Sequence, residues 1–197
     1  MIITVASFKG GVGKSTTALH LATYLQTKEP TLLVDGDLNR SALQWASSGN
    51  LPFKVVDEKA AVKHAKNYHH IVVDTPARPD PTELRTIAEG CDLLVLPTSP
   101  DALAMGAMLQ MLEALQGLDT DYKILLTLIP PAPSKVGDDA RTSLQNAGLP
   151  LFKTGIRRLA VFQRAALEGL PVNQVKGDSY AGIAWRCYAE VGKEILP

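Results

Sequence analysis

Residues 9–17, K-G-G-V-G-K-S-T-T, decide the fold of this chain. They follow an apolar run at residues 2–6 and precede apolar residues at helical spacing over residues 18–25. A strand, a glycine-rich turn and a helix in this order are typical of a phosphate-binding loop. The glycines let the backbone turn its N–H groups inward, and the helix N-terminus favours an anion. We therefore expect Lys14 to reach the β- and γ-phosphates of a nucleotide, and Ser15 to hold Mg²⁺.

The loop departs from the general P-loop pattern in an informative way. Gly13, Lys14 and Ser15 fit that pattern, but Phe8 replaces its first glycine and Lys9 lies inside the loop. The form K-G-G-x-G-K-[ST] resembles the deviant Walker A motif of the ParA/MinD family of ATPases. The resemblance implies ATP as the ligand, and a homodimer in which Lys9 reaches across to the phosphates bound by the partner. Two lysines on one loop repel each other unless a polyanion lies between or beside them, which agrees with such a role.

Apolar runs recur along the chain and alternate with helical patterns. Strands are predicted at residues 2–6, 31–34, 53–56 (a short edge strand), 70–74, 93–96, 124–129 and 150–153. Helices are predicted after the glycine-rich loop and at residues 41–46, 60–67, 102–115, 138–146, 159–168 and 178–195. This alternation predicts an α/β fold with one doubly wound, mainly parallel sheet flanked by helices. No linker or repeat is visible, so we expect residues 1–197 to form a single domain.

Carboxylates follow two of the predicted strands. The strand at 31–34 leads into Asp35 and Asp37, and the strand at 70–74 ends in Asp74, the Walker B pattern. Carboxylates at the carboxyl ends of parallel strands face a ligand bound there. We expect Asp74 to hold Mg²⁺ through a water. The resemblance implies that Asp37 is the switch-I aspartate, which orients the attacking water and touches the metal shell, while Asp35 is a weaker candidate, as an acceptor for loop N–H groups.

Two departures from the family concern the partner contacts and the base. Leu38-Asn39-Arg40 follows Asp37 where relatives have Pro-Gln-Gly or similar, and Thr127 stands near the end of a strand where many relatives have an asparagine that reads adenine. Adenine would then be held by Thr127, by backbone and by the loop around Pro171, which resembles the late G-x-P-V of the family. The resemblance assigns catalytic roles to Lys9, Lys14 and Asp37, and the metal to Ser15, Asp37 and Asp74. The expected nucleotide contacts are Gly10, Gly11, Val12, Gly13, Lys14, Ser15, Thr16, Thr127 and Pro171.

Composition and charge limit the other possibilities. With 197 residues, 46 % hydrophobic and 20 % charged, the chain suits a globular protein with a sizeable core. No leader or apolar run of membrane-spanning length is visible, so a cytoplasmic location is expected. Net charge is zero, but residues 1–140 hold 12 basic against 16 acidic residues, whereas residues 141–197 hold 8 against 4. A basic face is therefore possible in the last part of the chain.

The resemblance gives that basic part a role. The resemblance covers nearly the whole chain, up to the C-terminal G-L-P-V and the last helix. The chain resembles the small ParA proteins that lack an N-terminal DNA-binding domain. Such proteins partition plasmids or space carboxysomes and other cargoes over the nucleoid. They bind DNA without sequence preference in the ATP-bound state, and a ParB-like or carboxysome adaptor stimulates hydrolysis. The L-N-R-S-A-L-Q-W stretch and Thr127 favour the carboxysome type. The candidate DNA contacts are Lys153, Arg157, Arg158, Arg164, Lys176, Arg186 and Lys193.

Two other functions stay open. A MinD-like membrane shuttle would need a terminal amphipathic helix with clustered basic residues, but residues 181–197 carry only Arg186 and Lys193 beside apolar residues that suit core packing. We therefore expect no membrane contact. An ATP-dependent ligase of the dethiobiotin-synthetase kind would not need Lys9. The cysteines, Cys91 and Cys187, do not match the spacing of iron–sulfur relatives and are expected to be small apolar core residues.

Overall fold

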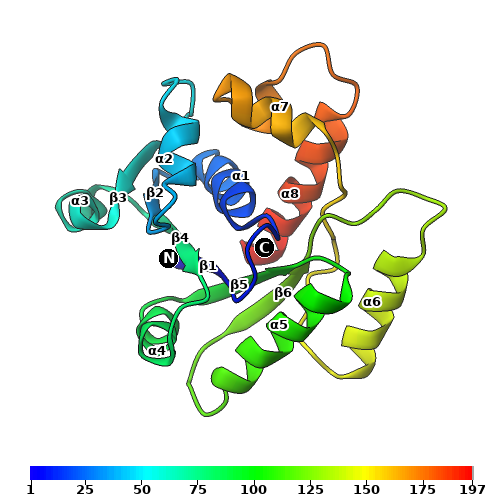
Figure 1. Cartoon of the computed structure of the whole chain (residues 1–197). Coiled ribbons are helices and arrows are strands. Elements are labelled where there is room, and N and C mark those ends of the chain that lie inside the picture. The colour runs from blue at the N-terminus through cyan, green and yellow to red at the C-terminus, as the bar shows by residue number, and fades with distance from the viewer. Residues whose placement is uncertain (197) are drawn as a thin grey trace.

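The structure is a computed structural model that describes residues 1–196, and it contains a six-stranded sheet with helices on both faces (Figure 1). Neighbouring strands are all parallel, in the order β3-β2-β4-β1-β5-β6. The strands are β1 (Ile2–Ser7), β2 (Thr31–Asp35), β3 (Lys54–Asp57), β4 (His70–Ala77), β5 (Leu93–Thr98) and β6 (Tyr122–Leu126). This architecture confirms the predicted doubly wound α/β fold.

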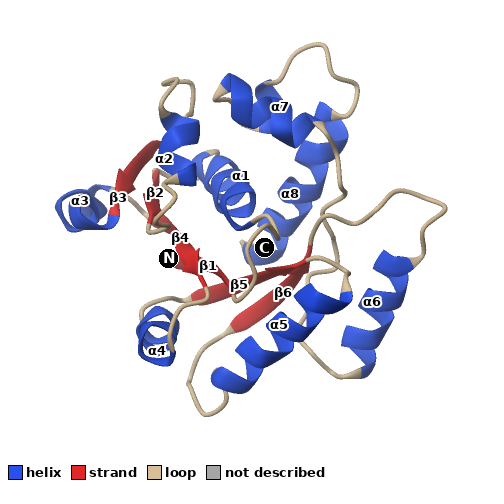
Figure 2. Cartoon of the chain, viewed as in Figure 1, coloured by secondary structure: helices blue, strands red, loops and turns tan. Residues whose placement is uncertain are grey.

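The helices form two layers, one on each face of the sheet (Figure 2). One layer holds α1 (Lys14–Gln26), α2 (Ser41–Ala46), α7 (Val161–Glu168) and α8 (Ala181–Ile195). The other holds α3 (Glu58–His64), α4 (Pro81–Glu89), α5 (Ala102–Ala114) and α6 (Val136–Asn146). Short 3₁₀ turns lie at Ala65–Asn67 and Val172–Gln174.

Strand side chains alternate between the two layers, because successive residues of a strand point to opposite faces. Ile3 and Val5 of β1 join the core beneath α1 and α8, whereas Ala6 joins the core with Met108 and Met111 of α5. Both faces are therefore buried, which explains why the strands are almost continuous apolar runs. On one side of β1 lie β4, β2 and β3, and on the other lie β5 and β6. The loop after β1 thus lies where the strand order reverses, the usual ligand position in this class of sheet.

Two sequence predictions are wrong at the β6 edge. Residues 150–153 form no strand, and only a single bridge joins Leu151 to Ile124. Pro150 has no N–H to donate, so the pairing is limited to its carbonyl and the Phe152 N–H. The strand predicted at 124–129 also ends early, at Leu126, and Leu128 has a left-handed φ of 51°, which regular strands exclude.

The sequence prediction also missed α4. Asp80 caps this helix and accepts the N–H groups of Thr82 and Glu83, while the Glu83 side chain accepts the Asp80 N–H. This reciprocal pair is a capping box, and Pro81 stands at the first helical turn. The signal D-P-T-E was therefore present in the sequence.

The contact between α1 and α8 depends on one glycine. Gly192 lies in α8 against the ring of Tyr24, and a Cβ built at this position would overlap that ring. Both residues are buried, and Tyr24 is only 7 % exposed. Because glycine has no side chain, the backbone of α8 approaches α1 closely, and the two helices pack tightly over the core.

Gly192→Ala should lower the free energy of unfolding by about 1–3 kcal/mol, because the added methyl group must displace a buried ring. Chemical denaturation followed by circular dichroism measures this value. Gly182→Ala, in the first turn of the same helix, is the matched control, since a Cβ there meets no atom within 4 Å. Equal effects of the two substitutions would contradict the proposed packing role.

Candidate nucleotide-binding site

The loop between β1 and α1 has the backbone that its glycines allow. Gly11 and Gly13 have left-handed φ angles of 78° and 85°, and a Cβ at either position would meet no atom within 4 Å. These positions therefore favour glycine because of the backbone conformation and not because space is short. Gly13 precedes α1 and supplies no side chain to cap it. The amide groups of the first turn are thus available to an anion.

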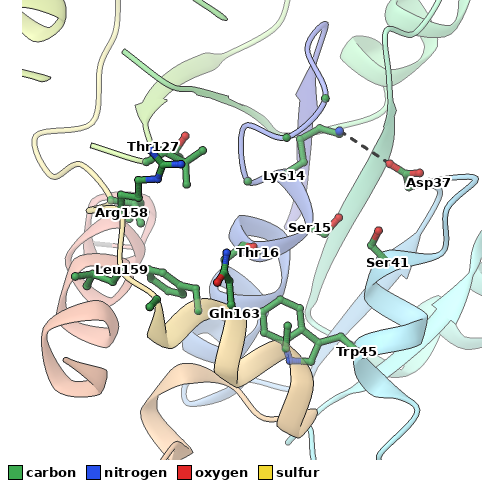
Figure 3. Close-up of a pocket in the computed structure, with 18 of the residues that line it drawn as sticks. Lys14, Ser15, Thr16, Asp37, Ser41, Trp45, Thr127, Arg158, Leu159 and Gln163 are labelled. Atoms are coloured by element: carbon green, nitrogen blue, oxygen red, sulfur yellow. Dashed lines mark ion pairs between the residues drawn. The ribbon is translucent and has the colours of Figure 1, made fainter. Parts of the chain in front are cut away.

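Lys14 lies at the centre of a buried group of charges. Its side chain is 6 % exposed, and its Nζ lies 4.0 Å from Oδ2 of Asp37, which is 9 % exposed (Figure 3). Asp35 pairs in register with Asp74 across β2 and β4. The Asp35 carboxylate accepts the N–H groups of Asp37 and Leu43 at 3.1 and 2.8 Å, so it fixes the loop that carries Asp37.

Asp74 is fully buried, at 0 % exposure. Within residues 1–196, neither oxygen of its carboxylate has a hydrogen-bond partner of good geometry. Burial raises the pKa of Asp74 to about 7, and Ser15 and Lys14 nearby oppose that rise. An unpaired buried carboxylate is costly, and a divalent cation would compensate it. Ser15 and Asp74 offer the hard oxygen ligands that Mg²⁺ prefers, so these residues fit that ion.

A cleft of about 1220 Å³ opens beside these charges (Figure 3). It is large enough for a nucleotide. It brings together many of the residues that the sequence predicted for the nucleotide, and Asp37, which was predicted for catalysis and the metal. These residues are Gly10, Gly11, Gly13, Lys14, Ser15, Thr16, Asp37 and Thr127. Val12, Pro171, Lys9 and Asp74 lie outside its lining. Sequence reasoning missed Trp45, Phe162 and Gln163, which line the cleft from α2 and α7.

The Thr127 side chain donates a hydrogen bond to the glycine-rich loop. Its hydroxyl lies 2.7 Å from the carbonyl oxygen of Val12 and 3.2 Å from that of Thr98, and the residue is 2 % exposed. A hydroxyl has one hydrogen, which is used here within the protein, so only oxygen lone pairs are left for a base. The contact of Thr127 with adenine stays a prediction.

His20 ties the loop helix to the late G-L-P-V segment, a link that the sequence did not indicate. Its Nε2 accepts the Val172 N–H at 3.0 Å, so Nδ1 carries the hydrogen and donates to the Thr16 carbonyl at 2.7 Å. The ring stacks on Tyr188 with centroids 4.9 Å apart, and the Tyr188 hydroxyl bonds to Thr17 at 3.1 Å. Burial lowers the pKa of His20 to about 4, so the ring is neutral at pH 7.

The predicted basic residues have different surroundings. Arg157 and Arg158 line the cleft, and Arg157 also shares a hollow of about 280 Å³ with Arg186 of α8. Arg164 pairs with Glu168 at 2.7 Å. The other candidates, Lys153, Lys176 and Lys193, are exposed, and Lys193 pairs with Glu190 at 2.7 Å. Lys9 contacts Asp101 at 2.8 Å, whereas Lys14 faces Asp37.

Fold and site together define a P-loop nucleotide-binding protein. Residues 3–172 match the family described as the CobQ/CobB/MinD/ParA nucleotide binding domain, and the chain belongs to this family. It is 35 % identical over 202 residues to the "Maintenance of carboxysome distribution protein A" of Gloeobacter kilaueensis, covering 98 % of this chain and 93 % of that protein. It is also 35 % identical over 147 residues to "Protein ParA" of Rhizobium radiobacter, covering 66 % of each.

Solved structures share the fold at low sequence identity. Apo McdA of Cyanthece superposes with a TM-score of 0.80 at 15 % identity, over 100 % of this chain and 99 % of that one. MinD of Pyrococcus horikoshii OT3, complexed with Mg-ADP, superposes with a TM-score of 0.74 at 20 % identity, over 98 % and 95 %. These likenesses confirm the P-loop fold.

The neutral His20 makes stability depend on pH. An unfolded histidine binds a proton below pH 6.5, while the folded ring binds one only near pH 4. The neutral His20 ring therefore makes its full contribution to the free energy of unfolding above pH 6.5. As the pH falls from 6.5 towards 4, the free energy of unfolding decreases by about 3 kcal/mol. His20→Gln should flatten the slope of unfolding free energy against pH between 6.5 and 5 in denaturant titrations.

His69→Gln, which removes an exposed imidazole, is the control for this measurement. Its side chain is 70 % exposed, so the change in slope should be smaller than in His20→Gln. An unchanged slope in His20→Gln would show that the folded ring takes up a proton as readily as the unfolded one, which would contradict the hydrogen bonds assigned to it.

Proposed function

We propose that this protein is an Mg²⁺-dependent ATPase. In this proposal it closes into a nucleotide-sandwiched homodimer, binds DNA without sequence preference, and positions a cargo such as a carboxysome or plasmid through an adaptor. The observation that carries the proposal is the buried Lys14–Asp37 pair, which lines a nucleotide-sized cleft. Close to it, the Asp74 carboxylate has no hydrogen-bond partner of good geometry within residues 1–196. Membership of the MinD/ParA family and the names of the carboxysome-distribution and ParA relatives support the cargo role.

Phosphoanhydride hydrolysis needs charge neutralisation and an oriented water more than covalent chemistry. Lys14 and the amides of the first turn of α1 would bind the phosphate oxygens, and Ser15 and Asp74 would hold Mg²⁺. When bound, the ion neutralises charge on the phosphates. Asp37 would orient the water, because its carboxylate is already fixed by the Asn39 N–H at 2.8 Å and faces Lys14.

Asp37→Ala should hydrolyse ATP at least about a hundredfold more slowly, because the carboxylate orients the attacking water. It should still bind ATP, because Asp37 does not contact the adenine. The ATP-bound dimer should then accumulate, as measured by light scattering coupled to size exclusion. Lys14→Ala is the contrasting variant, and should lose nucleotide binding itself. Unchanged turnover in Asp37→Ala would remove the catalytic role of this residue.

The DNA surface is proposed around Arg186, with Arg157, Arg158, Arg164 and Lys176 as further candidates. Arg157 and Arg186 share the hollow at α8, and their proximity would suit a phosphate backbone. Arg186 is the sharper test, because Arg157 and Arg158 also line the nucleotide cleft. A charge reversal at either of those two could act on ATP instead of DNA.

The deciding experiment measures binding to random-sequence DNA with ATP, with ADP and without nucleotide, at two salt concentrations. Binding should require ATP and weaken with salt, and Arg186→Glu should weaken it and lower the salt slope by about one per lost phosphate contact. Arg85→Glu on α4, which covers the opposite face of the sheet, is the matched control (Figure 1). Binding that Arg186→Glu leaves intact would move the DNA surface elsewhere.

Liposome sedimentation, run in parallel, separates the alternatives. The apolar residues Tyr188, Val191 and Ile195 of α8 are buried, which leaves them unable to enter a bilayer while the helix stays packed. Within residues 1–196, no helix is long and apolar enough to cross a membrane. Binding to liposomes alone would favour a MinD-like shuttle, and binding to neither DNA nor liposomes would favour a small-molecule ligase.

A further inference from the structure

The second lysine of the loop has a partner in its own chain. Lys9 Nζ lies 2.8 Å from Oδ1 of Asp101, which is 92 residues away and caps the N-terminus of α5. The same carboxylate accepts the Ala104 N–H at 3.0 Å and the Ser99 hydroxyl at 2.5 Å. The hydrogen bonds from Lys9 and Ser99 hold the pKa of Asp101 well below its usual range. Asp101 is therefore a charged and firmly oriented acceptor.

This pair gives the two loop lysines different surroundings. Lys14 is buried and faces Asp37, whereas the Lys9 side chain is 30 % exposed and its partner carboxylate is 51 % exposed. The short contact with Asp101 directs the Lys9 ammonium towards α5. A phosphate supplied by a second chain would compete with this carboxylate for the single positive charge of Lys9.

Two large apolar side chains that lie close in sequence to these charged residues are exposed. Leu103, two residues after Asp101, is 78 % exposed, and Leu38, which follows Asp37, is 90 % exposed. Single exposed apolar side chains are common on protein surfaces, and these two are open to contact with another chain. A second copy of this chain would bury these side chains when it meets the nucleotide site.

We propose that Asp101 is a positioning residue that holds Lys9 in its own chain until the phosphates bound by a second copy replace the carboxylate. This inference rests on the proposed sandwich dimer. Asp101 then sets a threshold for assembly, because each protomer must give up one ion pair to form the dimer. Without nucleotide, no anion compensates the released lysines, and the monomer is favoured.

Asp101→Asn tests the proposal, because asparagine still caps α5 while the charge is lost. Sedimentation with a non-hydrolysable ATP analogue gives the dimer dissociation constant. Since an exposed pair is weak and two are lost per dimer, the constant should fall by about two- to thirty-fold. Asp80→Asn is the matched control, because Asp80 caps α4 in the same way and has no basic partner among the ion pairs of residues 1–196. It should leave the constant unchanged.

A second readout separates this inference from the proposed function. In the nucleotide-free chain, Lys9 should react faster with an amine-acylating reagent in Asp101→Asn than in the wild type, as followed by mass spectrometry. A dissociation constant that is unchanged or raised in Asp101→Asn, while the wild type dimerises, would overturn the positioning role alone. Equal Lys9 reactivity would overturn it as well. A wild type that stays monomeric with the analogue would overturn the sandwich dimer, and with it the threshold.

Discussion

A buried charge imbalance at the ends of β1, β2 and β4 governs this structure. Lys14 supplies one positive charge, and three buried carboxyl groups lie at the same strand ends: Asp35, Asp37 and Asp74. Asp35 is satisfied by backbone N–H groups, but Asp74 has no hydrogen-bond partner of good geometry within the described residues. Such an arrangement is costly in the free protein and is relieved by a cation with phosphate. This charge balance supports the proposal that the site binds a metal–nucleotide complex.

Hydrogen bonds between segments that are distant in sequence stabilise the surroundings of the cleft. Thr127 joins the end of β6 to the glycine-rich loop, and His20 joins α1 to the segment after α7. Both groups are buried, so their hydrogen bonds are stronger than exposed ones and costly to break. The His20 bond connects α1 with the segment between α7 and α8, the helices that carry Arg164 and Arg186.

The sequence predicted local features well and long-range ones poorly. The alternation of strands and helices was confirmed, because apolar runs reflect burial on both faces of the sheet. Most of the loop residues line one cleft with Asp37, as expected for residues that follow neighbouring parallel strands, although their roles stay predictions. The strand at 150–153 was wrong, since an apolar run does not reveal that its chain meets β6 at a single bridge. The Lys9–Asp101 and His20–Val172 contacts span 92 and 152 residues, and no local pattern encodes them.

The central claim is that Asp74 holds a metal that completes the nucleotide site. Thermal unfolding with saturating ATP, with and without Mg²⁺, tests it most directly in the wild type and in Asp74→Asn. Ligand at a hundred times its dissociation constant adds about 2.7 kcal/mol, or roughly 5–10 °C for a chain of this length. We predict such a rise for the wild type with Mg²⁺, a smaller one when EDTA removes the ion, and little effect of Mg²⁺ on Asp74→Asn. Equal rises with Mg²⁺ and EDTA in the wild type would contradict the account.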